Sequence, residues 1–181
     1  MSSDGRFIGC VFLGVSVDGF IARLDGDLEW LTARGQIAGD AGFTPFIRSV
    51  DALLMGRRTY ELIAGEPRWP YLGNPVHVLS RTLPSAADER VAAVHRTPDD
   101  AVRALNEAGY GRVYLDGGRA VHAFLALGLV DELTLSQVPV LIGEGARWSG
   151  PLVADIDLEH VRTDVLPGGM VQSTWRARRD A

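Results

Sequence analysis

The residues best suited to chemistry lie between 115 and 120, where the sequence reads Leu-Asp-Gly-Gly-Arg-Ala. An apolar run over 112–115 precedes them, and a helical spacing of apolar residues over 121–128 follows. Gly117 and Gly118 would let the backbone turn tightly and let a ligand approach it. The start of the helix offers free N–H groups and a positive dipole, to which Arg119 adds a full charge. The segment therefore predicts a phosphate site, although a Gly-Gly turn is also ordinary loop chemistry.

Two further strand ends carry groups that suit a phosphate. Gly56-Arg57-Arg58-Thr59 follows the apolar run 52–55, and Ser80-Arg81 follows the run 75–79. In an open α/β sheet, ligands bind beyond the carboxyl ends of the strands. Three such ends could face one ligand, and arginine is the cation that best matches phosphate oxygens. The alternative is that these arginines are solvated surface charges.

Composition excludes several classes of protein. All 18 basic residues are arginine, which rules out a Walker-type P-loop and a lysine Schiff base. The formal net charge of -5 argues against nonspecific nucleic-acid binding. Residues 143–148 begin like a dinucleotide fingerprint, but Trp148 replaces its third glycine, so we predict a loop there.

The cysteine and histidine content indicates a reducing compartment without a metal site. Cys10 is the single cysteine, and the four histidines are scattered without ligand spacing. The N-terminus has no signal-peptide pattern, and no apolar stretch reaches membrane-spanning length. We therefore expect a cytoplasmic protein that binds neither membrane nor metal.

The order of apolar patterns predicts one α/β domain over residues 1–181. Strands that alternate with helices imply a mostly parallel sheet covered on both faces, and Pro167-Gly168-Gly169 joins a closing antiparallel hairpin. Thr44-Pro45 and Thr97-Pro98 are typical of helix starts, and 22–42 is predicted to be a long loop. Strands are predicted at 6–17, 52–55, 75–79, 91–95, 112–115, 132–140, 158–166 and 170–178, and the other helices begin after Gly56 and at 119.

The ordered set of motifs resembles the dihydrofolate reductase superfamily, closest to the reductase domain of bifunctional riboflavin-pathway deaminase-reductases and their stand-alone relatives. No single motif is specific, but the set spans nearly the whole chain. The segments that carry the resemblance are Ser16-Val17-Asp18-Gly19-Phe20-Ile21-Ala22, Leu54-Met55-Gly56-Arg57-Arg58-Thr59-Tyr60-Glu61, Val78-Leu79-Ser80-Arg81, Leu115-Asp116-Gly117-Gly118-Arg119, Leu129-Val130-Asp131-Glu132-Leu133 and Pro139-Val140-Leu141-Ile142-Gly143-Glu144-Gly145.

The resemblance implies a three-layer α/β/α sandwich that binds NADPH. In the family, the turns that match Gly56 to Thr59 and Gly117 to Arg119 hold the cofactor's phosphates, and the residues after the Leu-Ser strand end meet the adenosine 2′-phosphate. Carried over, the 2′-phosphate site would use Arg57, Ser80 and Arg81. The pyrophosphate site would use Gly56, Thr59, Gly117, Gly118 and Arg119. The nicotinamide would lie against Ile21 and Ala22, with Gly14 allowing close approach.

Two aspartates are the candidates for catalytic roles. Folate reductases carry an acidic residue on the helix after the first loop, and counting back from Gly56 puts the matching position at or near Asp40. Asp40 would then anchor the substrate or supply a proton, but it could equally be a loop or capping residue. Asp18 could orient the first loop over the nicotinamide or simply cap a turn. Trp30 could form a pocket wall, but an aromatic residue beside Leu31 is more often core.

The expected activity is reduction of a small heteroaromatic substrate, such as a pterin or pyrimidine, by hydride transfer from NADPH. The alternative is a non-catalytic nucleotide- or ligand-binding protein with the same fold. Riboflavin-pathway reductases usually carry a lysine where this chain has Phe20, and a single cysteine cannot build the zinc signature of their deaminase partner. The resemblance alone also suggests a homodimer.

Overall fold

The computed structural model describes residues 5–66, 69–85 and 88–178. Residues 1–4, which carry most of the N-terminal segment judged above not to be a signal peptide, lie outside these ranges. The elements, in chain order, are β1 (Ile8–Ser16), β2 (Phe20–Ala22), α1 (Glu29–Ala38), α2 (Phe43–Arg48), β3 (Ala52–Gly56), α3 (Arg57–Ala64), β4 (Val76–Leu79), β5 (Val91–His95), α4 (Pro98–Glu107), β6 (Arg112–Asp116), α5 (Gly118–Ala126), β7 (Glu132–Val138), β8 (Ala146–Arg147), β9 (Leu158–Leu166), a 3-10 turn η1 (Pro167–Gly169) and β10 (Met170–Ala177).

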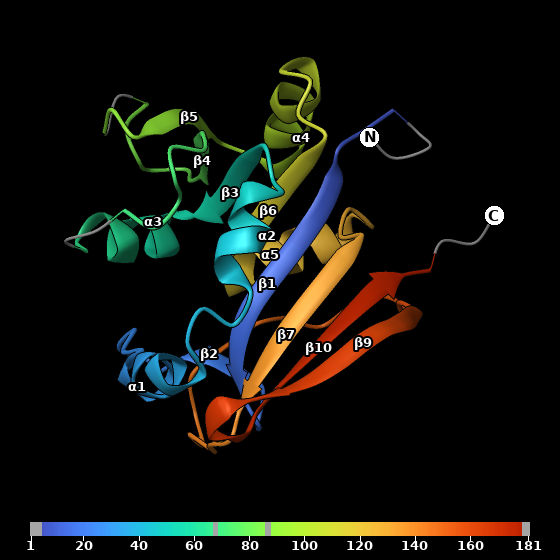
Figure 1. Cartoon of the computed structure of the whole chain (residues 1–181). Helices are drawn as coiled ribbons and strands as arrows, with labels where there is room; N and C mark the ends of the chain where they lie inside the picture. Colours follow the sequence, from blue (N-terminus) through green and yellow to red (C-terminus); the bar gives the residue numbers. More distant parts are fainter. Residues whose placement is uncertain (1–4, 67–68, 86–87, 179–181) are drawn as a thin grey trace.

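A single large sheet organises the chain (Figure 1). Its strand order is β5-β4-β3-β6-β1-β7-β10-β9, and the six strands from β5 to β7 pair in parallel. β10 runs antiparallel to both β7 and β9, with η1 joining β9 to β10 as the hairpin turn. The prediction of a mostly parallel sheet with an antiparallel C-terminal hairpin is therefore confirmed.

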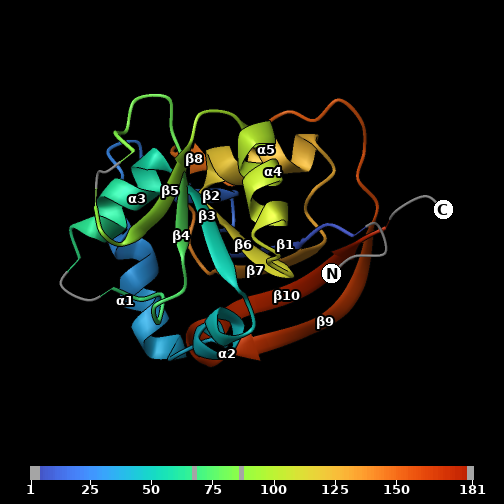
Figure 2. The same ribbon diagram turned by 90° about the horizontal axis from the view of Figure 1, so that it is seen from above.

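Helices cover both faces of this sheet, as a three-layer sandwich requires. On one face, α4 and α5 place Leu105, Val121 and Phe124 in the core with Val11 and Leu115. On the other face, α2 and α3 pack on the strands through a second cluster that includes Ile47, Tyr60, Leu53, Met55 and Tyr114. Figure 2, viewed from above, separates α4 and α5 from α2 across the sheet. Because parallel strands bury both faces, their sequences are nearly continuous apolar runs.

The long loop predicted over 22–42 is wrong, because α1 occupies Glu29–Ala38. This helix buries only Trp30, so its sequence lacks the repeated apolar spacing that indicates a helix. Trp30 packs with Val138 and Met170, which makes it a core residue. The predicted cap at Thr44 also moves: the N-cap of α2 is Gly42, and Thr44 lies inside the helix.

The helix start predicted at Thr97-Pro98 is confirmed. The Thr97 side chain accepts a hydrogen bond from the backbone N–H of Asp100 at 3.1 Å, and Pro98 opens α4. The predicted loop over 143–148 is correct except for the two-residue strand β8, which pairs with β2.

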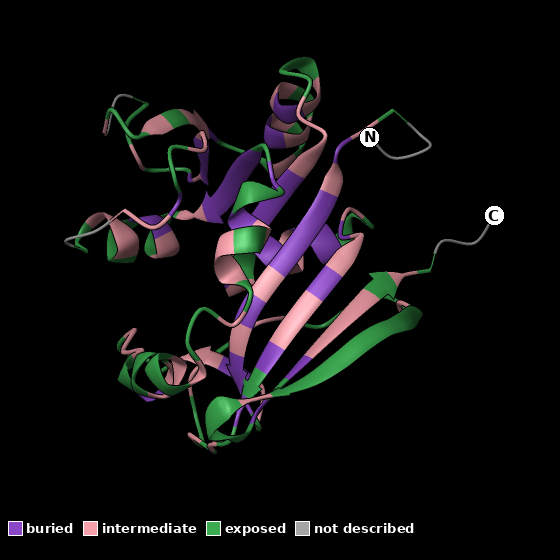
Figure 3. Ribbon diagram, viewed as in Figure 1, coloured by how far each residue is buried: buried purple, intermediate pink, exposed green. Residues whose placement is uncertain are grey.

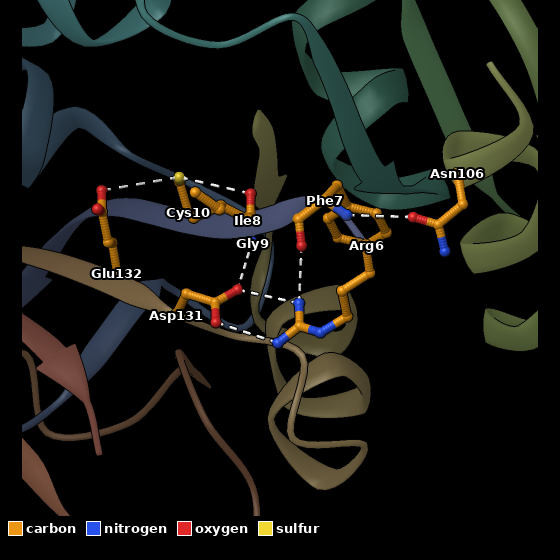
Figure 4. Close-up of polar contacts among 8 residues, drawn as sticks. All are labelled: Arg6, Phe7, Ile8, Gly9, Cys10, Asn106, Asp131 and Glu132. Carbon is orange, nitrogen blue, oxygen red and sulfur yellow. Dashed lines mark hydrogen bonds and ion pairs between the residues drawn. The ribbon is translucent and has the colours of Figure 1, made fainter. Parts of the chain in front are cut away.

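The amino end of β1 is fixed to the start of β7 by Asp131 (Figure 4). Its carboxylate accepts two hydrogen bonds from the Arg6 guanidinium, each at 3.0 Å, and one from the backbone N–H of Gly9 at 2.8 Å. The backbone N–H of Phe7 donates to Asn106 at the end of α4. These contacts hold the edge of the sheet opposite to the carboxyl ends of β1 and β7.

β9 forms the outer edge of the sheet, and every residue from Leu158 to Val165 is exposed (Figure 3). No helix in the described ranges has both the length and the apolar character needed to cross a membrane. Within the same residues, histidine, cysteine and carboxylate side chains nowhere gather in a group of three that could hold a metal ion.

Candidate active site

The three strand ends singled out in the sequence meet at one edge of the sheet. β3 is hydrogen-bonded to β6 on one side and to β4 on the other. The register pairs Met55 with Asp116 and Gly56 with Leu79, so the turns that follow these strands start at the same level. The prediction that these ends are neighbours is confirmed for Gly56, Ser80 and Gly117.

Gly117 and Gly118 form a turn so crowded that no side chain fits at either position. Gly117 has a φ of +86°, and a Cβ built on it would overlap the Thr59 hydroxyl from the first turn of α3. A Cβ on Gly118 would overlap the backbone carbonyl of Arg147 and would come 3.2 Å from Ile21 Cδ1. Four elements, α3, α5, β2 and β8, therefore meet at this turn.

The first N–H groups of α5 are not used by the helix itself. The first hydrogen bond of this helix runs from the Val121 N–H to the Gly117 carbonyl at 2.9 Å. The N–H groups of residues 118–120 precede it and have no partner within the helix. The positive end of the helix dipole coincides with them, and the exposed Arg119 begins the same turn. This arrangement suits a phosphate or pyrophosphate group.

Ile21 and Ala22, the predicted nicotinamide contacts, form a wall beside the turn. They belong to β2, which pairs antiparallel with β8. The Ala22 carbonyl lies where a Cβ on Gly145 would be, so the 143–147 loop packs closely on β2. Both residues are partly exposed, so β2 can present them to a ligand.

The third strand end is a braced loop. The buried Ser80 hydroxyl accepts hydrogen bonds from the backbone N–H groups of Thr82 at 3.2 Å and Leu83 at 2.9 Å. Arg96 Nη1 donates to the carbonyls of Ser80 at 2.9 Å and Leu83 at 2.8 Å. Ser80 therefore shapes the loop, while the neighbouring Arg81 is exposed.

The arginines differ in how strongly the protein holds them. Arg57 makes a half-exposed ion pair with Glu61 at 3.4 Å, one turn along α3. Such a pair contributes little to stability and leaves the guanidinium free to turn toward a ligand. Among the residues that the structure describes, Arg58, Arg81 and Arg119 have no carboxylate partner.

Gly14 lies against α1 rather than beside an open space. A Cβ built at this position would overlap the Leu31 side chain of that helix. The group that comes close to Gly14 is therefore Leu31, whereas the resemblance implies a cofactor there. Leu31 belongs to a segment that was predicted to be a loop. Contact between Gly14 and a cofactor stays a prediction.

Asp18 fastens the loop after β1 to the loop after β7. Its carboxylate accepts hydrogen bonds from the backbone N–H of Gly143 at 2.7 Å and of Ile142 at 3.2 Å. Hydrogen bonding with Ser16, together with these backbone contacts, lowers the pKa of Asp18 below its ordinary value. These contacts join the β1–β2 loop to the loop after β7, and orientation of the first loop over the nicotinamide stays a prediction.

Asp40 has the contacts of a helix cap. Its carboxylate accepts hydrogen bonds from the Thr44 backbone N–H at 3.1 Å and from the Thr44 hydroxyl at 2.6 Å, and the residue is exposed. These contacts fit the alternative interpretation of Asp40 as a loop or capping residue, and substrate anchoring or proton supply by Asp40 stays a prediction.

Asp116, at the end of β6, belongs to a motif singled out in the sequence but was given no role there. The Tyr71 hydroxyl donates a hydrogen bond to its carboxylate at 3.1 Å. Burial raises the pKa of Asp116 above its ordinary value, although the hydrogen bonds from tyrosine oppose the shift. A carboxyl group at the end of an otherwise apolar strand, directly before Gly117, was the available signal.

Asp116 shares a sheet face with a group of aromatic residues. Tyr114, two residues earlier on β6, lies on the same face and donates its hydroxyl to the Phe12 carbonyl at 2.8 Å. The Phe46 ring stacks on Phe12 with centroids 4.8 Å apart and meets Tyr114 edge-on at 4.9 Å. The site thus combines a phosphate cradle, an apolar wall, a carboxyl group of raised pKa and aromatic rings.

Comparison with known proteins shows which family this chain resembles. The family model described as RibD C-terminal domain matches residues 74–171. The chain is 30% identical to the uncharacterized protein YwjB of Bacillus subtilis, over 75% of this chain and 78% of YwjB. It is also 30% identical to the uncharacterized protein YyaP of the same bacterium, over 90% of this chain and 91% of YyaP.

A solved structure extends the similarity to the whole fold. A putative riboflavin biosynthesis protein from Shewanella sp. PV-4 superposes with a TM-score of 0.86 at 30% identity. The alignment covers 96% of this chain and 100% of that protein.

Proposed function

We propose that this chain, which belongs to the RibD C-terminal domain family, is an NADPH-dependent reductase of a small heteroaromatic ring such as a pterin or pyrimidine. The observation that carries the proposal is the meeting of Thr59, Gly117 and Gly118 below the free N–H groups of α5. A Cβ at Gly117 would overlap the Thr59 hydroxyl and one at Gly118 would overlap the Arg147 carbonyl, so only glycine lets these groups close around the start of α5.

The residues present fit a dinucleotide phosphate. The N–H groups of residues 118–120 and the Thr59 hydroxyl would hold the pyrophosphate, with Arg119 beside them. Arg57 and Arg81 would bind the 2′-phosphate that distinguishes NADPH from NADH. Ile21 and Ala22 would contact the nicotinamide. When bound, the cofactor supplies the hydride, and the protein contributes position and charge.

The proton that must accompany the hydride is best held by Asp116. Its raised pKa keeps the carboxyl group protonated to a higher pH than an exposed aspartate, and Tyr71 fixes its orientation. The partly buried Phe12 and Phe46, on the same face, would hold an aromatic ring near this acid, with the buried Tyr114 packed behind them. Asp40 would instead keep α2 in place through Thr44.

Cofactor binding can be tested by titrating the purified protein with NADPH and with NADH while following tryptophan fluorescence. Trp148 packs on the same core as Ile21, so a bound dihydronicotinamide should quench it. We expect saturable quenching at micromolar NADPH and weaker binding of NADH. Absence of saturable NADPH binding would overturn the proposal. Binding without turnover of any pterin or pyrimidine would favour the non-catalytic alternative.

A further inference from the structure

We propose that Arg147, to which neither the motifs nor the resemblance gives a role, is a phosphate-binding residue of this site; the inference rests on the proposed function. Arg147 lies in β8, paired with Phe20 of β2. Its backbone carbonyl occupies the space over Gly118 where a side chain would stand. Arg147 is therefore part of the wall of the phosphate cradle, although it is distant from the Gly117–Gly118 turn along the chain.

The guanidinium of Arg147 is held on a rigid platform. Its central carbon lies 4.7 Å from the centroid of the Phe20 ring, which is buried. The Phe20 backbone N–H donates to the buried Ser16 hydroxyl at 2.9 Å, so the platform is fixed to the end of β1. Nη1 of Arg147 lies 3.4 Å from the position that a Cβ on Gly19 would take. The Phe20 ring thus favours one position of the exposed Arg147 guanidinium.

The donors of this guanidinium are not used by the protein. Within the described residues, Arg147 forms neither a hydrogen bond through its side chain nor an ion pair, and its one side-chain partner is the Phe20 ring. By contrast, Arg6, Arg90 and Arg112 each bind a carboxylate at 3.0 Å or less. An arginine with unused donors, carried by the strand whose backbone borders the Gly117–Gly118 turn, is matched to phosphate oxygens.

The segment that carries Arg147 is itself fastened to the first loop. Asp18 accepts hydrogen bonds from Ile142 and Gly143, and Gly145 packs on the Ala22 carbonyl. The phosphate could come from the cofactor's pyrophosphate or from a phosphorylated substrate. Both sources present the same chemistry, and they can be separated by the choice of probe.

The test measures the affinity of NADPH and of ribose 5-phosphate for wild-type protein and for Arg147→Gln by calorimetry. Loss of one charge-assisted contact should weaken binding by about tenfold or more. Weaker NADPH binding alone assigns the contact to a phosphate of the cofactor, and weaker ribose 5-phosphate binding alone assigns it to the substrate. Arg147→Lys should restore only part of the affinity, because lysine lacks the planar fork.

Arg162→Gln is the matched control, since this arginine is on the exposed strand β9 and pairs with Asp164 at 3.3 Å. It should change neither affinity. Suppose that wild-type protein binds NADPH and that Arg147→Gln has the same affinity as wild type for every probe that wild type binds. The role of Arg147 is then overturned, while the proposed function stands. If wild-type protein binds neither probe, both are overturned.

Discussion

At the scale of single residues, the side chains at the carboxyl edge divide into those that shape the site and those free to bind. The side chains of Asp18, Asp40 and Ser80 accept hydrogen bonds from backbone N–H groups, in the loop after β7, in the first turn of α2 and in the loop after β4, respectively. Arg81 and Arg119 are exposed and have no carboxylate partner within the described ranges. Residue type alone could not separate these two groups, because an aspartate that caps a helix and one that supplies a proton look alike in a sequence.

Replacement of Arg57 tests the selection of the cofactor. Arg57→Ala should weaken NADPH binding about tenfold and leave NADH binding nearly unchanged, because only NADPH carries the 2′-phosphate. The half-exposed pair with Glu61 contributes little, so the fold should be unaffected. Fluorescence titration with both cofactors measures the difference, and equal losses for both would remove this role from Arg57.

The pH dependence of turnover tests Asp116. Burial raises its pKa, so the acid is protonated at low pH and loses its proton as the pH rises. We therefore expect kcat to fall on the alkaline side of this pKa in wild-type enzyme. Asp116→Asn should lower kcat by about a hundredfold and remove that limb of the profile. An unchanged profile in the variant would exclude Asp116 as the proton donor.

At the scale of elements, the longer strands and the helices with a buried apolar stripe could be predicted, whereas α1 and the short strands β2 and β8 were missed. β3, β4 and β6 are short, mostly apolar runs that end in, or are followed by, glycine or polar residues, so both their positions and their carboxyl ends could be predicted. α1 was missed because it buries one residue and contains Gly35. Because α1 was not predicted, the contact between its Leu31 and Gly14 could not be predicted either.

The contacts that join the start of β1 to the start of β7 should stabilise the fold without affecting the affinity for NADPH. The Arg6–Asp131 pair is mostly buried, and Asp131 also holds the Gly9 N–H. Asp131→Ala should lower the free energy of unfolding by about 3 kcal/mol, because it removes the carboxylate that neutralises a mostly buried guanidinium. Chemical denaturation measures this loss. NADPH affinity of the folded variant should stay within about twofold of wild type, and a large loss would connect the two ends of the sheet.

The edge formed by β4 and β5 should make the protein sensitive to mild acid. His77 Nδ1 and His95 Nε2 lie 2.8 Å apart in a buried, stacked pair, and Tyr110 meets His77 edge-on. Burial, and then the neighbouring His95, lowers the pKa of His77 to about 4. The unfolded chain takes up this proton near its ordinary pKa of about 6.5, so the folded state loses stability as the pH falls below that value.

The expected loss is about 2 kcal/mol between about pH 7 and pH 5. Urea denaturation at a series of pH values measures it. His160→Gln, which alters an exposed histidine bonded to Thr163, should show the same loss as wild type. A flat profile over this range would contradict the neutral, buried pair.

At the scale of the whole molecule, the sheet order brings together turns that are far apart along the chain, since Gly56 and Gly117 follow neighbouring strands. The motifs predicted that these turns share an edge, and the register confirms it. The pairing of β2 with β8 could not be predicted from the sequence, because β8 has only two residues and no apolar pattern.

The homodimer stays a prediction. β9 lies at the edge of the sheet with its residues 158–165 exposed, which leaves room for association without covering the cradle. Sedimentation equilibrium at micromolar protein should give twice the mass of the chain. A mass of 19.6 kDa would show a monomer.

The central claim is that the Gly117–Gly118 turn receives the pyrophosphate of NADPH, and a crystal structure of the protein with NADPH tests it most directly. The account predicts phosphate oxygens within hydrogen-bond distance of the N–H groups of residues 118–120, with the nicotinamide against Ile21 and Ala22. NADPH bound elsewhere on the molecule, with these N–H groups facing only water, would contradict it.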